Sequence, residues 1–280
     1  MLNKKFIIIL TLSLLYQSSL SSKSTSFGEF NSKNLSKYFS GIVAFENKDN
    51  SIALNYFNSS KILINQHDPY LERFVMSLVL EDKVSHAVNY IKANSKKNNS
   101  NFFEAYILLA LDGIEKNNID KALKILSEVP EDLQKDRFNY IIINSLKEYL
   151  YVFKNKKILK EKKNFNNLSF IADTFQRCYV GDITTGSFFS KLVNNSQADY
   201  SRYIFFYLTY LIENNQIEEA KSITDKLDFI NSSLLLSQGK SWIESNELNK
   251  FSEVFSCKNH NDVIGEFLFL ISNLYSAQNE

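Results

Sequence analysis

The sequence predicts an all-α protein built from consecutive antiparallel helix pairs, and three observations support this prediction. The 280 residues include only 7 glycines and 2 prolines, well below the average usage of roughly 7% and 5%, which disfavours folds rich in tight turns. Apolar residues recur at helical spacing on both sides of short polar turns. Small residues recur at a fixed period, because Ala53, Ala87 and Ala122 lie 34 and 35 residues apart (87 − 53 and 122 − 87). About fourteen helices are expected.

The first pair is contained in GIVAFENKDNSIALNYF, from Gly41 to Phe57. The polar turn ENKDN separates two apolar segments of helical period. Small side chains at Gly41 and Ala53 allow two helices to approach closely, and Phe57 is expected to fill the space behind them. The same layout returns over residues 74–91 and 105–126.

A helix-turn-helix unit of this period resembles the tetratricopeptide repeat. The resemblance implies that residues 33–280 form a right-handed superhelix, an α-solenoid of stacked antiparallel helix pairs. Residues 203–223 give the best late copy, in which Ala220 follows Gly186 by 34 residues (220 − 186). Residues 132–167 fit poorly, so a degenerate repeat is expected there, with the basic stretch 154–163 as a solvated linker.

The first 21 residues have the layout of a secretory signal peptide. Two lysines precede a ten-residue, largely apolar run, 6–15, and small residues follow. Ten apolar residues are too few to span a bilayer, so no stable membrane span is expected after removal of the signal; an uncleaved anchor is the alternative. Residues 22–32 are expected to be a flexible lead-in.

With this signal, SGIVAFENKDNSIALNYF and IGEFLFLISNLYSAQN are similar to stretches of exported tetratricopeptide-repeat proteins of alphaproteobacteria. This similarity implies export to the bacterial periplasm or cell envelope. The family binds proteins or extended peptides along a concave surface lined by the first helix of each pair. Its groove-facing spacing, carried onto this chain, gives a mostly apolar set of candidate binding residues: Tyr38, Ile42, Phe45, Ile107, Leu111, Glu115, Phe205, Thr209 and Ile212. The alternative for each is packing against a neighbouring repeat.

Composition and motifs give no indication of catalysis. The net charge of +1 provides no general attraction to nucleic acid or anionic membrane. The three histidines have no second ligand at metal-binding spacing, and GDITTG (181–186) lacks the lysine of a phosphate-binding loop. We therefore predict a non-enzyme without metal or cofactor, and expect no nucleic-acid partner.

Two functions follow from these features. The first is a non-catalytic scaffold that mediates protein–protein interaction in the cell envelope. The second is the helical superstructure of an envelope enzyme acting on peptidoglycan, with its catalytic part beyond residue 280.

The cysteines and the C-terminal segment lead to two further expectations. Cys178 and Cys257 are 79 residues apart (257 − 178), too far for a disulfide along an elongated stack, so both are interpreted as buried apolar residues. Residues 262–279 predict an amphipathic helix that starts a new repeat and ends in mid-repeat. Its apolar stripe is expected to remain uncovered and to mediate self-association; the stripe comprises Ile264, Phe267, Leu268, Ile271 and Leu274.

Overall fold

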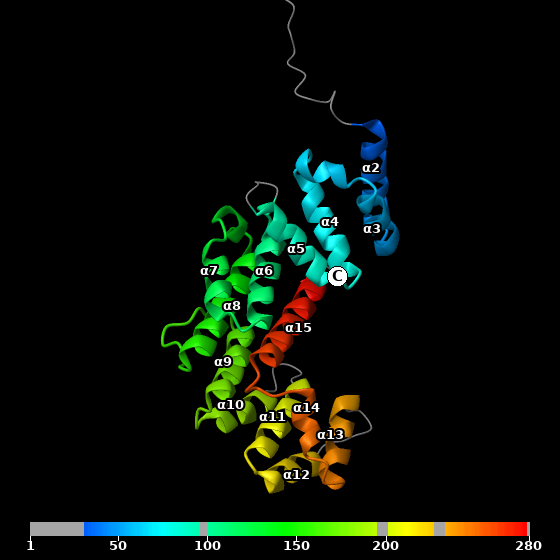
Figure 1. The fold of residues 1–280 in the computed structure, drawn as a ribbon. Helices are drawn as coiled ribbons and strands as arrows, with labels where there is room; N and C mark the ends of the chain where they lie inside the picture. Colours follow the sequence, from blue (N-terminus) through cyan, green and yellow to red (C-terminus); the bar gives the residue numbers. More distant parts are fainter. Residues whose placement is uncertain (1–30, 96–99, 195–200, 227–232, 279–280) are drawn as a thin grey trace, which may run out of the picture. The chain divides into compact units, whose positions relative to one another are not determined.

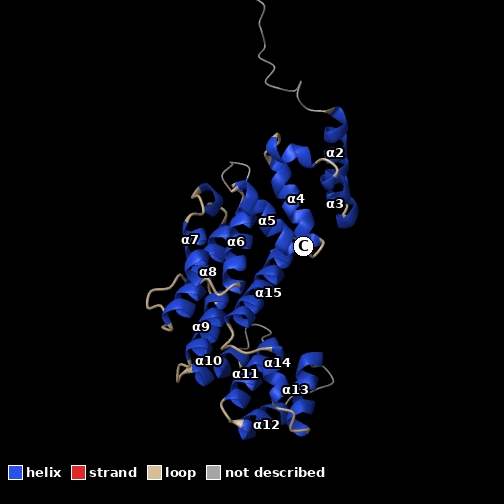
Figure 2. Cartoon of the chain, in the orientation of Figure 1, coloured by secondary structure: helices blue, strands red, loops and turns tan. Residues whose placement is uncertain are grey.

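The computed structural model describes residues 31–95, 100–194, 201–226 and 233–278. These residues form fourteen α-helices, and they include no β-strand (Figure 2), which confirms the all-α prediction. None of the described helices is both long and apolar enough to cross a membrane. The predicted signal peptide, 1–21, lies outside the described residues. The chain divides into two compact units, 1–100 and 101–280, called here the N-terminal and the C-terminal unit.

The described residues of the N-terminal unit form two helix pairs. Its elements are α2 (Ser32–Glu46), α3 (Asn50–Asn58), the 3₁₀ segment η2 (Lys61–Asn65), α4 (Pro69–Leu80) and α5 (Val84–Asn94). Helix α2 packs on α3, α3 on α4, and α4 on α5. Pro69 stands in the first turn of α4, where the missing N–H of proline costs no helical hydrogen bond.

Small residues and aromatic rings form the core of the N-terminal unit. Ala53 and Phe57 are fully buried, and the Phe57 ring lies directly against Gly41. A chain of ring contacts continues from Tyr38 to Tyr70, with centroids 5.5 Å apart, and from Tyr70 to Phe74 at 5.9 Å. The Tyr70 hydroxyl donates a hydrogen bond to the backbone carbonyl of Phe57, so this buried polar group is satisfied.

The described residues of the C-terminal unit form ten helices, which Figure 1 labels along the chain. They are α6 (Phe103–Glu115), α7 (Ile119–Ser127), α8 (Arg137–Asn155), α9 (Asn167–Val180), α10 (Thr185–Val193), α11 (Ser201–Glu213), α12 (Ile217–Asp225), α13 (Leu234–Glu244), α14 (Asn249–Val254) and α15 (His260–Gln278). A 3₁₀ turn, η4 (Asp132–Gln134), precedes α8. From α6 to α12, each helix packs on the next one in the chain.

The turn inside most pairs has the same backbone structure. One residue adopts positive φ, and the amide of the following residue donates to the carbonyl five positions before it, as in the Schellman motif. The positive-φ residues are Lys48, Asp82, Asn117, Gly181, Asn215 and Asn246. The first three are 34 and 35 residues apart (82 − 48 and 117 − 82). The turns therefore recur at the same period as the buried alanines.

Helix α15 folds back onto earlier helices of the C-terminal unit. It contacts α8 and α9, alongside which it lies in Figure 1, and the rings of Tyr149 and Phe267 are 5.4 Å apart. Ile264, Phe267 and Ile271 are buried, whereas Leu274 is 40% exposed. The expectation of an uncovered apolar stripe is therefore wrong, because packing against earlier helices, α8 and α9 among them, buries most of it.

The return of α15 also places the two cysteines together. Cys178 in α9 and Cys257 just before α15 form a disulfide, with Cα atoms 5.7 Å apart. The prediction of two unbridged cysteines is wrong because it assumed an elongated stack, in which residues this distant in sequence stay apart. The chain instead reverses after α14, which brings the start of α15 back to the end of α9.

Candidate functional site

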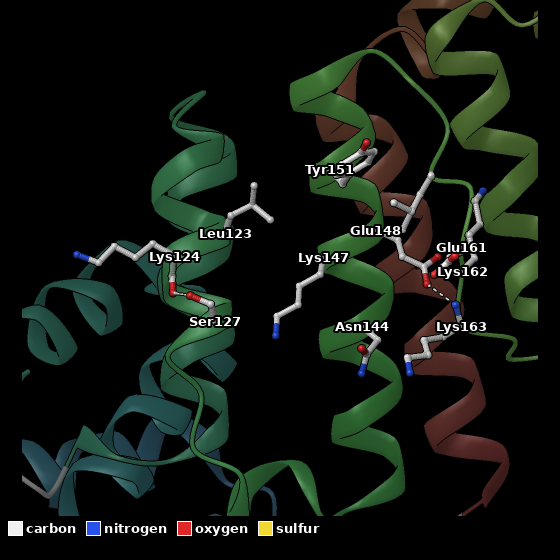
Figure 3. A pocket seen from close by; sticks show the side chains of 11 residues that line it. Leu123, Lys124, Ser127, Asn144, Lys147, Glu148, Tyr151, Glu161, Lys162 and Lys163 are labelled. Atoms are coloured by element: carbon white, nitrogen blue, oxygen red, sulfur yellow. Dashed lines mark hydrogen bonds between the residues drawn. The ribbon is translucent and has the colours of Figure 1, made fainter.

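A groove in the C-terminal unit brings several polar side chains together (Figure 3). Its volume is about 800 Å³, within the range of roughly 300–1,000 Å³ that is typical of ligand sites. Three elements line it: α7, α8 and the irregular segment 156–166. The lining residues are Leu123, Lys124, Ser127, Asn144, Lys147, Glu148, Tyr151, Leu159, Glu161, Lys162 and Lys163.

Local sequence signals position the two helices that form the groove walls. The Asn118 side chain caps α7 by accepting from the Lys121 amide, and the Asp136 side chain caps α8 by accepting from two amides; such caps satisfy donors that a helix start leaves free. Lys154 forms an ion pair with Asp120 at 2.5 Å, which links the end of α8 to the start of α7. Lys156 then ends α8 with positive φ.

The third wall, segment 156–166, is attached to both α8 and α9. The Lys162 ammonium lies 2.5 Å from the Asp173 carboxylate and 2.8 Å from the Gln176 side-chain oxygen. The backbone amide of Lys163 donates to the Glu148 carboxylate at 3.1 Å. The expectation of a solvated linker is thus wrong at Lys162, whose side chain is only 19% exposed.

Two lysine ammonium groups of the groove lack a partner. Lys162 pairs with Asp173, and Lys124 lies 3.8 Å from Glu128. In the part of the chain that the structure describes, the ammonium groups of Lys147 and Lys163 have neither an ion pair nor a hydrogen bond. Figure 3 shows the Lys147 side chain extending into the space between α7 and α8. Burial lowers the pKa of Lys147, because partial desolvation disfavours its charged form.

The groove also contains carboxylates, of which Glu148 is the more buried. Burial raises the pKa of Glu148, while the hydrogen bond from the Lys163 amide and the charge of Lys162 act in the opposite direction. Its carboxylate faces segment 156–166 in Figure 3. Glu161 is exposed. Cations, carboxylates and apolar surface thus converge, a combination suited to non-covalent recognition of a ligand with both charged and apolar groups.

The candidate residues predicted from sequence do not line this groove. Tyr38, Ile42 and Phe45 belong to α2 of the N-terminal unit, and the other six to α6 and α11 of the C-terminal unit. Tyr38, Phe205 and Thr209 are buried. Glu115 is exposed, and Ile42, Phe45, Ile107, Leu111 and Ile212 are half-buried.

Phe205 illustrates the packing alternative considered for these residues. Its ring stacks on Phe251, with centroids 5.4 Å apart, and meets Trp242 edge-on at 6.3 Å. Sequence reasoning missed the groove lysines, of which Lys147 lies on α8 and Lys162 and Lys163 lie in segment 156–166. The basic stretch 154–163 was a visible signal, but nothing in the sequence showed that it folds against α8 and α9.

The described residues contain no group of three or more His, Cys, Asp or Glu side chains placed to hold a metal ion. Comparison with protein-family models, with curated proteins and with solved structures finds no match. The groove is therefore interpreted from its own chemistry.

Proposed function

We propose that this chain is an exported, non-catalytic scaffold that binds another protein, or an extended peptide segment of one, in the bacterial cell envelope. The observation that carries the proposal is the groove between α7 and α8. Its lining offers unpartnered ammonium groups beside the apolar surfaces of Leu123 and Tyr151, which is suited to holding a polypeptide by side-chain contacts.

The Cys178–Cys257 disulfide supports the exported location. Structural disulfides persist in oxidising compartments such as the periplasm and are rare in the cytosol. The sequence of residues 1–21, with its charged start and apolar centre, is consistent with a route to such a compartment.

The resemblance to tetratricopeptide repeats supports a binding role for the array as a whole. Helix pairs that recur every 34 or 35 residues, each with the same turn, favour a solenoid arrangement. Repeat arrays of this kind present extended surfaces for partner proteins. The superhelical arrangement is part of the proposal.

Site-specific photo-crosslinking in living cells tests the binding role. A photoreactive phenylalanine analogue would replace Tyr151, which lies in the groove, and in a second strain Leu234, which is 76% exposed on α13. We expect adducts with the same protein in repeated experiments from position 151 and not from position 234. Absence of adducts at position 151, or equal adducts at both positions, would contradict the proposal.

A reporter enzyme that is active only outside the cytoplasm tests export. Fused after residue 30, it should be active, and it should lose activity when Ile8 and Leu12 are both replaced by Asp, because charges in the apolar centre block membrane insertion. Activity that persists in the double variant would exclude residues 1–21 as the export signal.

A further inference from the structure

We propose that the groove between α7 and α8 binds an extended peptide segment that carries acidic side chains beside apolar ones, with Lys147 and Lys163 pairing with its carboxylates. The inference rests on the proposed function and specifies the chemistry of the partner.

The charges of the groove favour an anionic ligand. The ammonium groups of Lys124 and Lys162 have carboxylates of the same chain beside them, Glu128 and Asp173. Within the described ranges, those of Lys147 and Lys163 form no ion pair with a carboxylate, and Glu148 feels the Lys163 charge only from a longer distance. Lys147 is half-buried, so an incoming carboxylate meets a cation that is already partly desolvated. An ion pair formed there is screened less by salt than a pair on an open surface.

The remaining lining suits a polypeptide backbone. The Asn144 side-chain nitrogen donates to the Tyr140 carbonyl at 2.7 Å, which leaves the Asn144 side-chain oxygen available to accept a backbone N–H. Glu161 can accept another, since it is exposed at the edge of the groove. Leu123 and the ring of Tyr151, which is 37% exposed, offer apolar contact area to the ligand's side chains.

The carboxylates disfavour two other anionic partners. Nucleic acid carries one negative charge per ≈ 1.7 Å of duplex axis, and such a dense charge would be repelled by Glu148 and Glu161. An anionic membrane presents a broad surface, whereas the free cations here lie in a groove. Separate acidic side chains, spaced by apolar residues, carry a lower charge density and can place single carboxylates at Lys147 and Lys163.

Selection from a random dodecapeptide display library tests the inference with the full-length chain. The matched pair of variants is Lys147→Gln/Lys163→Gln, in the groove, and Lys157→Gln/Lys160→Gln, which removes the same charge from exposed positions outside the groove lining. We expect enrichment of peptides with Asp or Glu beside apolar residues. The best peptide should bind the groove variant about ten-fold more weakly. A ten-fold loss corresponds to about 1.4 kcal/mol of binding free energy, which lies between the usual contributions of exposed and of buried ion pairs. It should bind the control variant with unchanged affinity.

Several results would overturn the inference. The first is selection of peptides without enrichment in Asp or Glu. The second is equal peptide affinity for the parent and the groove variant, or an equal loss of affinity in both double variants. The third is displacement of the peptide by vesicles that contain phosphatidylglycerol. Should the double groove variant fail to fold, Lys163→Gln alone, at an exposed position, is expected to weaken binding about three-fold, and unchanged affinity would again overturn it. Adducts from position 151 with no acidic preference would leave the scaffold proposal standing and remove only this inference.

Discussion

The ring of Phe57 occupies the space that a side chain on residue 41 would need. A Cβ atom built on Gly41 would lie 2.8 Å from the Phe57 Cε1 atom, closer than carbon atoms normally approach, and Phe57 is fully buried. The absence of a side chain at residue 41 therefore sets the distance between α2 and α3. The close approach of α2 and α3 that the sequence predicts is therefore present where Gly41 meets Phe57.

Gly41→Ala should destabilise the N-terminal unit. Displacing the buried ring costs about 1–3 kcal/mol, which exceeds or offsets the gain of roughly 0.5–1 kcal/mol from replacing a helical glycine. Gly265→Ala is the control, because a Cβ there meets no atom within 4 Å, and it should be mildly stabilising. Chemical denaturation measures both. A Gly41→Ala protein at least as stable as the parent would show that the Phe57 ring can move at little cost.

Ala53→Leu and Ala122→Leu should each destabilise the protein. Both alanines are fully buried, and a Cβ on Gly113 would lie 3.3 Å from that of Ala122. Overpacking such a contact costs about 1–3 kcal/mol. Ala93→Leu, at an exposed position of α5, should change the unfolding free energy by less than about 0.5 kcal/mol. Equal melting temperatures for the three variants would contradict the assignment of Ala53 and Ala122 to close helix contacts.

Reduction of the Cys178–Cys257 disulfide should lower the stability of the C-terminal unit by about 2–5 kcal/mol, because it removes a constraint on the unfolded chain. Thermal unfolding with and without a reductant measures this change. The Cys178→Ser/Cys257→Ser variant should melt at a lower temperature than the oxidised parent and be insensitive to reductant. Titration of the native protein with a thiol reagent should detect no free thiol, and two reactive thiols would exclude the bond.

Glu148→Gln should stabilise the protein near neutral pH. Burial raises the pKa of Glu148 above its ordinary 4.5 in the folded chain, so the stability of the parent decreases as pH rises from that value through the raised one. Glutamine retains an acceptor for the Lys163 amide and removes the titration. The gain in melting temperature should be largest near pH 7 and should diminish toward about pH 4.

Glu161→Gln provides the control for this experiment. Glu161 is exposed at the edge of the same groove, so its replacement should leave the pH dependence of stability as in the parent. A Glu148→Gln protein whose stability followed that of the parent at every pH would show that Glu148 remains ordinarily solvated.

Local features of the fold could be predicted from the sequence. The turn expected at ENKDN separates α2, which ends at Glu46, from α3, which begins at Asn50. Helical periodicity and polar turns depend on neighbouring residues, so one sequence contains the necessary information. Contacts between residues distant in sequence do not depend on neighbouring residues alone, so the local pattern does not predict them. The Cys178–Cys257 disulfide and the cover over Phe267 depend on where the chain reverses after α14, which no local pattern specifies.

The groove was missed for the same reason. Lys162 and Lys163 were visible as part of a basic stretch, and Lys147 as a charge beside Glu148 in a mostly apolar segment. Their convergence depends on two contacts. The Lys162–Asp173 ion pair joins residues 11 positions apart, and the hydrogen bond from the Lys163 amide to Glu148 joins residues 15 positions apart. These contacts form only when segment 156–166 reverses the chain direction.

The position of α15 has a consequence for how the C-terminal unit unfolds. Where each repeat touches only its neighbours, an array can lose its repeats from one end while the rest remains folded. Helix α15 is the final helix among the described residues, but it contacts α8 and α9. Its release therefore exposes helices in the middle of the unit. We therefore expect this unit to unfold in a single cooperative step. Because contacts between positions distant in sequence slow folding, it should also fold more slowly than a strictly sequential array of the same length.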